Sequence, residues 1–403
     1  MENSLRQERL YVILLAAIQF IHMVDFVVMM PLGPTLMQDF KIGPTEFGTL
    51  VSSYNFSAAL FGFCFAMIAD RFGRKHSLLV ALLGLALGTL TCSLANSFLT
   101  LLVARILTGV FGGILNALTF IIVTDLIPFK RRGKAMGAVM ASFSLASVLG
   151  VPLGLTIADN YGWERTFMLI AVVAIILAAV SLRVFPALKD HVHKTNAAAA
   201  IKRFYRLIVF PAYARAYLYI FVMAGSMFLL IPFLAPYAVK NMGIMSHQLK
   251  YMYLVAGAVT ALTAPLIGRL TDKWGTFPMF TALSLLSCIP IYILTNAGVV
   301  SLATYILIST FFMLLVSGRM IPAMTLISAV PEHSQRGSFM VLLNAVRSSG
   351  SALGTLLGGI LITQNQMGQL QHFNSTGFLS MAISLVAIYL ALKMYRQLSK
   401  TGL

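Results

Sequence analysis

Twelve long apolar segments constrain the fold of this chain more than any other feature of its sequence. A helix needs about 20 predominantly apolar residues to cross the hydrocarbon core of a bilayer. Such segments lie approximately at 10–30, 46–68, 77–95, 98–123, 135–158, 164–184, 213–238, 248–268, 277–295, 300–328, 337–362 and 374–393. They are continuously apolar rather than alternating with polar residues, which excludes a transmembrane β-barrel. Only 10% of the residues are charged, against about a quarter in a soluble domain. We therefore predict an all-α integral membrane protein with twelve transmembrane helices.

The basic residues predict how the chain lies across the membrane. The formal net charge is +17, and most of the 29 Lys and Arg residues fall in the termini and in loops on one face. Cytoplasmic loops carry such an excess, so we expect both termini to be cytoplasmic and the basic face to contact anionic lipid headgroups. This distribution argues against a nucleic-acid partner. The amino terminus leads straight into a full-length span, so no cleavable signal peptide is expected.

The second half of the sequence repeats features of the first. Asp70-Arg71-Phe72-Gly73 follows the second apolar segment, and Asp272-Lys273-Trp274-Gly275 follows the eighth. Two further matches, Arg132 with Arg336 and Gly150 with Gly354, have nearly the same spacing. Recurrence at a fixed spacing indicates an internal repeat, and parallel repeats of six helices place a substrate site at their interface near the bilayer midplane. We predict six-helix bundles at 1–184 and 213–403, joined by a cytoplasmic linker at 185–212.

The repeated loop and two motifs inside the spans resemble a known family. The loop matches the signature G-x-x-x-D-R-x-G-R-K of the major facilitator superfamily, except that its leading Gly is Ala66. Arg105 and Gly109 resemble the R-x-x-x-G motif of the fourth span. The whole chain resembles the twelve-helix drug/proton antiporters of that superfamily, which include bacterial sugar-efflux and drug-efflux permeases. The resemblance implies a monomeric secondary transporter. The residues that match the loop signature are Asp70, Arg71, Gly73, Arg74 and Lys75.

Two motifs have both a mechanical and a packing interpretation. In the family the loop cluster is linked to gating, which here implies Asp70 to Lys75 and its repeat at Asp272, Lys273 and Gly275; the alternative is a basic anchor with internal salt bridges. Gly150, Pro152 and Gly154 resemble the antiporter motif of the fifth span. Small residues let helices approach closely and Pro interrupts backbone hydrogen bonding, so tight packing is as good an explanation as coupling.

Ionisable residues within the spans predict where the chemistry takes place, because burying a charge in a membrane is expensive. Asp25 is the one carboxylate well inside a span. Burial disfavours its charged form and a nearby Arg favours it, so Asp25 can take up and release a proton. We predict proton coupling at Asp25 with Arg105; the alternative is a permanent ion pair between them. His22 lies on the same helical face as Asp25 and either shares the proton or is simply hydrogen-bonded.

Arg319 and Arg347 are two further charges within spans. If both face the substrate cavity together with Asp25 and Arg105, the cavity is positively charged and favours an anionic substrate. Alternatively, Arg319 bonds carbonyl groups freed near Pro322, and Arg347 points to a helix end. The three cysteines lie within spans and suggest no disulfide or metal site.

These observations predict a proton-coupled secondary transporter of the bacterial inner membrane, working by alternating access and exporting a small organic molecule. The sequence lacks the loop G-x-x-x-x-G-K-[ST], so we expect an ion gradient to supply the energy, and no cofactor or metal. One alternative is a proton-coupled importer of an organic anion. Another is a transporter-like receptor that does not transport, which would not need Asp25 and Arg105. An enzyme is not expected, because no clustered catalytic set is present; His191 and His193 lie in the polar linker.

Overall fold

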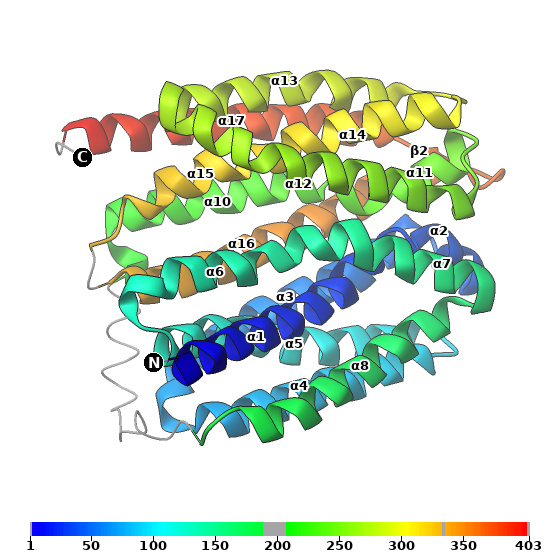
Figure 1. Ribbon diagram of the computed structural model, residues 1–403. Helices are drawn as coiled ribbons and strands as arrows, with labels where there is room; N and C mark the ends of the chain where they lie inside the picture. Colours follow the sequence, from blue (N-terminus) through cyan, green and yellow to red (C-terminus); the bar gives the residue numbers. More distant parts are fainter. Residues whose placement is uncertain (1, 188–206, 333–334, 401–403) are drawn as a thin grey trace. The chain divides into compact units, whose positions relative to one another are not determined.

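The computed structural model describes residues 2–187, 207–332 and 335–400, and this part of the chain is almost entirely helical (Figure 1). The expected linker histidines, His191 and His193, lie outside the described residues. The chain divides into two compact units, one containing Met1–Met29 and Ser53–Arg203 and the other Met30–Ser52 and Phe204–Leu403. The division crosses a continuous helix, α3 (Pro44–Ile68), at Ser53.

The first unit contains Asp25 and Arg105. In it α1 packs against α5, α6 and α8, and α4 packs between α5 and α8. Its elements are α1 (Glu2–Val28), the larger part of α3, a 3-10 turn η1 (Ala69–Arg71), α4 (Arg74–Ser93), α5 (Phe98–Leu126), α6 (Phe129–Leu145), a π turn η2 (Ala146–Gly150), α7 (Val151–Tyr161) and α8 (Trp163–Val184).

The second unit has α10 packed against α16 and α17, and α13 packed against α14, α15 and α17. A two-residue antiparallel pair of strands precedes α17. Its elements are α2 (Gly33–Asp39), the first turns of α3, α10 (Pro211–Phe228), η3 (Ile231–Phe233), α11 (Leu234–Asn241), η4 (Ser246–Gln248), α12 (Leu249–Trp274), α13 (Thr276–Asn296), α14 (Leu302–Gly318), α15 (Met320–Ser328), α16 (Arg336–Leu361), β1 (Thr363–Gln364), β2 (Leu370–Gln371) and α17 (Phe373–Lys400).

Local sequence explains where these helices begin and break. Ser97 caps α5 by accepting a hydrogen bond from the Thr100 amide, and Ser301 caps α14 in the same way, as serine does at helix N-termini. Both halves also break their first long helix at proline. The break follows α1 before Pro31, and the break after α10 contains Pro232, since proline lacks the amide hydrogen that a helix interior needs. The repeat inferred from the loops therefore extends to caps and helix breaks.

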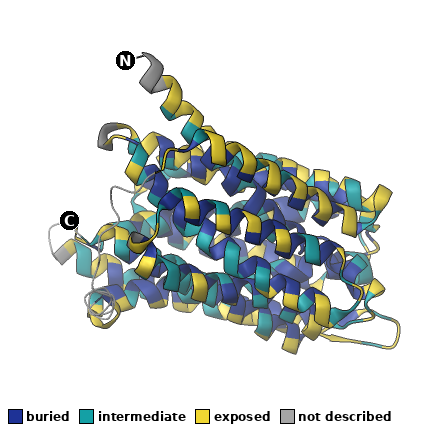
Figure 2. Ribbon diagram, turned by 90° about the horizontal axis from the view of Figure 1, so that it is seen from below, coloured by how far each residue is buried: buried dark blue, intermediate teal, exposed yellow. Residues whose placement is uncertain are grey.

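Eleven stretches of the described chain are long and apolar enough to span a membrane, judged by length and composition. They correspond to the predicted segments with one exception, 337–362. That segment forms the 26-residue helix α16, whose length suffices for a span. Asn344, Arg347 and several serines and glycines dilute its apolar content. Large apolar residues such as Leu262 and Ile289 are exposed, and exposed residues recur along the helices in Figure 2, as expected of a surface in contact with lipid.

Close helix packing in the second unit depends on glycine. On α16, Gly350, Gly354 and Gly358 lie one turn apart and face the backbone of α10 at Phe221, Gly225 and Leu229. Small residues spaced in this way let two helix backbones approach closely. The N-terminal end of α3 makes a similar approach to α16, where the Thr45 hydroxyl donates to the carbonyl oxygen of Gly359 at 2.9 Å.

Candidate functional site

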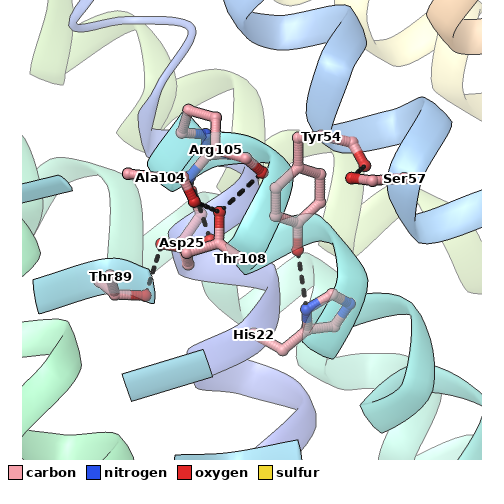
Figure 3. Close-up of polar contacts among 8 residues, drawn as sticks. All are labelled: His22, Asp25, Tyr54, Ser57, Thr89, Ala104, Arg105 and Thr108. Atoms are coloured by element: carbon pink, nitrogen blue, oxygen red, sulfur yellow. Dashed lines mark hydrogen bonds and ion pairs between the residues drawn. The ribbon is translucent and has the colours of Figure 1, made fainter. Parts of the chain in front are cut away.

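Asp25 and Arg105 form an ion pair inside the first unit (Figure 3). Arg105 Nη1 on α5 lies 3.1 Å from Asp25 Oδ2 on α1 and 3.4 Å from the Asp25 carbonyl oxygen. Both residues are completely buried, with 0% of their surface exposed. The sequence prediction that these two residues come together is consistent with this geometry. The geometry alone fits both a proton-coupling pair and a permanent ion pair.

The second oxygen of the Asp25 carboxylate is also bonded. Thr89 on α4 donates its hydroxyl hydrogen to Asp25 Oδ1 at 3.2 Å, and Thr89 is completely buried. Three helices therefore hold this carboxylate. Removing one partner of a buried, hydrogen-bonded ion pair typically costs about 3–5 kcal/mol, because the other charge is left uncompensated.

Tyr54 connects the ion pair to His22. The Arg105 guanidinium carbon lies 4.4 Å from the centre of the Tyr54 ring, within the range of a cation–π interaction. The Tyr54 hydroxyl lies 3.0 Å from His22 Nδ1, and Phe26 stacks on the Tyr54 ring. His22 thus reaches Asp25 through Tyr54 and Arg105 rather than directly, and Arg105 Nε has no hydrogen-bond acceptor among the described residues.

Glycines on α5 make this cluster possible. A Cβ at Gly109 would meet the Tyr54 carbonyl oxygen at 2.5 Å and would overlap the Ser57 hydroxyl. One turn on, a Cβ at Gly112 would meet the Tyr54 hydroxyl at 2.5 Å and His22 Nδ1 at 3.0 Å. The R-x-x-x-G spacing therefore has a physical reason: Arg105 reaches Asp25 while Gly109, one turn along, lets α3 approach with its tyrosine.

Replacing Gly109 by Ala is expected to separate α5 from α3 and to lower both stability and transport. The added methyl meets backbone atoms of Tyr54, which cannot rotate away, and overpacking of this kind costs about 1–3 kcal/mol. Gly137→Ala is the matched control, because nothing lies within 4 Å of a Cβ at that position in α6. Thermal unfolding and transport by the two variants would be compared; equal behaviour would show that the close approach is unimportant.

The motif in the fifth span packs against α1 beside Asp25. The π turn Ala146–Gly150 precedes Pro152, consistent with the predicted interruption of backbone hydrogen bonding. A Cβ at Gly150 would overlap Val24, and a Cβ at Gly154 would meet Val28 at 2.8 Å. Since Val24 adjoins Asp25 in the chain, movement of this segment would reach the ion pair through α1.

The motif of the loop between α3 and α4 makes its ion pair with a residue outside the motif. Arg74 Nε lies 3.0 Å from Asp125 Oδ2 at the end of α5, and Arg74 Nη1 donates to the Ala69 carbonyl oxygen at 2.6 Å. Gly73 precedes α4 as its N-cap. Arg71 is exposed and Lys75 is half-buried. The side chain of Asp70 lies outside the described part of the structure.

The charged residues of the corresponding loop in the second half are more exposed. Asp272 and Lys273 are exposed in the last turn of α12. Gly275 ends that helix with a φ of +91°, a backbone conformation that favours glycine. The structure describes no ion pair for Asp272 or Lys273 with any residue whose side chain it places.

The two other arginines that were predicted to lie within spans, Arg319 and Arg347, belong to the second unit. Arg319, at the junction of α14 and α15, is 1% exposed and donates to the hydroxyls of Ser384 at 2.9 Å and Ser226 at 3.0 Å. Its guanidinium therefore bonds hydroxyl groups and not the carbonyls near Pro322. Arg347 is half-buried in the middle of α16, away from either helix end.

Sequence reasoning missed the neutral partners Thr89, Tyr54, Ser226 and Ser384. Isolated hydroxyl residues are common in membrane helices, so only the three-dimensional contacts distinguish them. The Gln19 side chain, which donates to Asn116 at 3.0 Å, was missed for the same reason. Among the residues the structure describes, no group of three or more His, Cys, Asp or Glu side chains could hold a metal ion.

Comparison with known proteins extends over the whole length of the chain. The family model described as Major Facilitator Superfamily matches residues 15–216 and 216–401. The uncharacterized MFS-type transporter YceJ of Bacillus subtilis (strain 168) is 25% identical over 96% of this chain and 95% of its own. Multidrug resistance protein 2 of the same organism is 24% identical over 91% and 92%. The crystal structure of a bacterial homolog to the human lysosomal transporter Spinster superposes with a TM-score of 0.76 at 18% identity, covering 98% and 97%.

Proposed function

Because the chain belongs to the Major Facilitator Superfamily, we propose that it is a proton-coupled antiporter that exports a small organic molecule, with Asp25 as the proton-binding group. Family membership itself makes the chain a multi-pass membrane protein and a secondary transporter of small molecules, not an enzyme. The similarity to a multidrug resistance protein supports export. We further propose that it acts as a monomer in the bacterial inner membrane with cytoplasmic termini.

The observation that carries the proposal is the buried Asp25–Arg105 pair with Thr89. A carboxylate held completely away from water is expensive to keep charged, so its occupancy by a proton depends strongly on its contacts. Any conformational change that moves α1 against α4 or α5 alters those contacts. Proton binding and the alternating-access cycle are thereby linked through one residue. A receptor that does not transport would gain nothing from such a pair.

In this proposal the loop motif and the fifth-span motif take part in the conformational change. The contacts of Arg74 with Asp125 and Ala69 stabilise the cytoplasmic ends of α4 and α5, and we assign Asp70, Arg71 and Lys75 with their repeat to gating. Gly150, Pro152 and Gly154 transmit movement to α1, because the π turn weakens the regular helix next to Val24.

An experiment with purified protein in liposomes containing a pH dye tests this proposal. An imposed proton gradient and a panel of cationic, neutral and anionic compounds are used, with empty liposomes as background. We expect at least one compound to produce proton movement, in the direction opposite to its own. Movement of compound and protons in the same direction would support the second candidate, a proton-coupled importer, which the buried Arg319 and the half-buried Arg347 favour if the compound is an anion. Transport without protons would exclude both.

Tyr54 provides a test of whether His22 takes part. Tyr54→Phe keeps the ring against Arg105 but removes the hydroxyl bonded to His22. If the proton is shared with His22, Tyr54→Phe should slow proton movement markedly, while stability falls by about 1–3 kcal/mol because His22 Nδ1 is left buried and unpaired. Tyr54→Leu, which removes the cation–π contact as well, should impair both. Unchanged proton movement in Tyr54→Phe would limit His22 to a structural role.

A further inference from the structure

Arg319 is a buried positive charge with neutral partners. It lies between α14 and α15 as the cap residue of both, and its guanidinium donates to Ser384 on α17 and Ser226 on α10. Both serines are at most 1% exposed. Burying a charge costs several kcal/mol unless an opposite charge compensates for it, and serine hydroxyls supply only dipoles.

The second unit offers no carboxylate for this purpose among its described residues. Its acidic side chains, Asp39, Glu46, Asp272 and Glu332, are all exposed. Arg105 in the first unit differs in this respect, because it has Asp25. The two buried arginines are thus chemically unlike: one has its counter-charge built in and the other does not.

The internal repeat places Ser226 where the first unit has Asp25. Asp25 lies six residues before Pro31, and Ser226 lies six residues before Pro232, each at the break of the first helix in its half. Each residue also bonds the buried arginine of its own unit. The second half therefore has a corresponding contact between its buried arginine and a residue of its first helix, but that residue, Ser226, carries no negative charge.

Three buried donors of the second unit lack an acceptor. Arg319 Nε, the Tyr219 hydroxyl and the Ser284 hydroxyl are buried without a hydrogen-bond partner among the described residues. Tyr219 lies on α10, the helix that carries Ser226, and Ser284 lies on α13, where its carbonyl oxygen accepts from Cys288. A buried, uncompensated guanidinium with an unpaired N–H donor is what an anion site requires.

We propose that Arg319, beside Ser226 and Ser384, binds a monovalent anion through its guanidinium, either the carboxylate of a transported substrate or an inorganic ion such as chloride; the two serine hydroxyls donate to the Met223 and Ser380 carbonyl oxygens. The bound anion takes the place that a carboxylate side chain holds in the first unit. The guanidinium is enclosed here, so the anion reaches it when neighbouring side chains part, and binding depends on conformation. The bound anion would be the substrate or a co-substrate of the proposed transporter. Only this physiological role rests on the proposed function; anion binding itself does not.

Thermal unfolding of the purified full-length protein in detergent tests the site without requiring transport. Sodium chloride, acetate and benzoate are compared at fixed ionic strength, with isethionate as the reference anion. We expect at least one of them to raise Tm saturably, by about 2–5 °C at 100-fold excess over its dissociation constant. A response to chloride alone identifies an inorganic ion, and a response to acetate or benzoate alone identifies a carboxylate.

Variants test whether the rise in Tm is caused by anion binding at Arg319. Arg319→Gln should lose it, whereas Arg269→Gln, which removes an exposed arginine of the same unit, should keep it. Ser226→Asp should raise Tm without added anion and abolish the response, because it restores the missing carboxylate. Absence of a response in the native protein, or a response that survives in Ser226→Asp or Arg319→Gln, overturns the proposal. Asp25→Asn should keep the response, which separates failure of this inference from failure of the proton-coupling proposal.

Discussion

Replacing Asp25 by Asn is expected to reduce substrate-driven proton movement to the level of empty liposomes. The amide has nearly the shape of the carboxylate: its oxygen can still accept from Arg105, and its NH2 group can donate to the Thr89 hydroxyl oxygen, but it cannot bind and release a proton in the relevant range. Exchange of substrate for substrate across the membrane, which needs no net proton movement, can survive in this variant. Dye-loaded liposomes and uptake of labelled substrate would separate the two activities. Asp159→Asn, which changes an exposed carboxylate in α7, should behave as the native protein does.

The same substitution also affects stability, and this effect needs its own control. Asp25→Asn leaves Arg105 buried without a counter-charge, which should cost about 3–5 kcal/mol. In the double variant Asp25→Asn with Arg105→Gln both charges are gone, and replacement of a whole buried pair by neutral groups is often nearly neutral. If the pair is only structural, the double variant should recover transport together with stability. If Asp25 carries the proton, stability should return and proton movement should not; proton movement that persists in Asp25→Asn itself would contradict the assignment.

The membrane fold could be predicted from the sequence because its signals are long and repeated. Eleven of the twelve predicted segments meet the length and composition of a span, and the twelfth forms α16. Asp25 and Arg105 stood out because charges are rare in apolar segments, and their contact at 3.1 Å agrees with the expectation that their helices are neighbours. The role of each partner in proton movement remains a prediction.

Other parts of the site depend on packing that no local pattern reveals. Tyr54 and Thr89 are ordinary residues for a membrane helix, and their importance comes from facing Arg105 and Asp25. The sequence analysis considered Arg74 within its own loop, whereas the partner that the structure gives it, Asp125, is at the far end of another helix. Gly150 and Gly354 each lie against the first helix of their half, α1 and α10, yet their surroundings differ. Gly150 faces a valine side chain, and Gly354 faces the backbone of α10.

Because Gly354 faces backbone atoms, Gly354→Ala is expected to lower the stability of the protein strongly. The new Cβ would lie 2.9 Å from the Gly225 Cα and would overlap the Gly225 carbonyl oxygen. A backbone cannot move aside as a side chain does, so α16 has to shift away from α10. We expect a loss of at least about 2 kcal/mol, towards the upper end of overpacking costs. The measurement is thermal unfolding of the purified protein, with transport in liposomes as a second readout.

Gly337→Ala in the same helix should instead raise the stability of the protein. Nothing lies within 4 Å of a Cβ at Gly337, and replacing an unobstructed helical glycine by alanine stabilises by about 0.4–1 kcal/mol. Gly150→Ala should fall between the two, since Val24 can adjust but is stiff because it is β-branched. Equal effects at Gly354 and Gly337 would mean that α10 and α16 are not in contact through these glycines. In that case the close approach would not be what holds the second unit together.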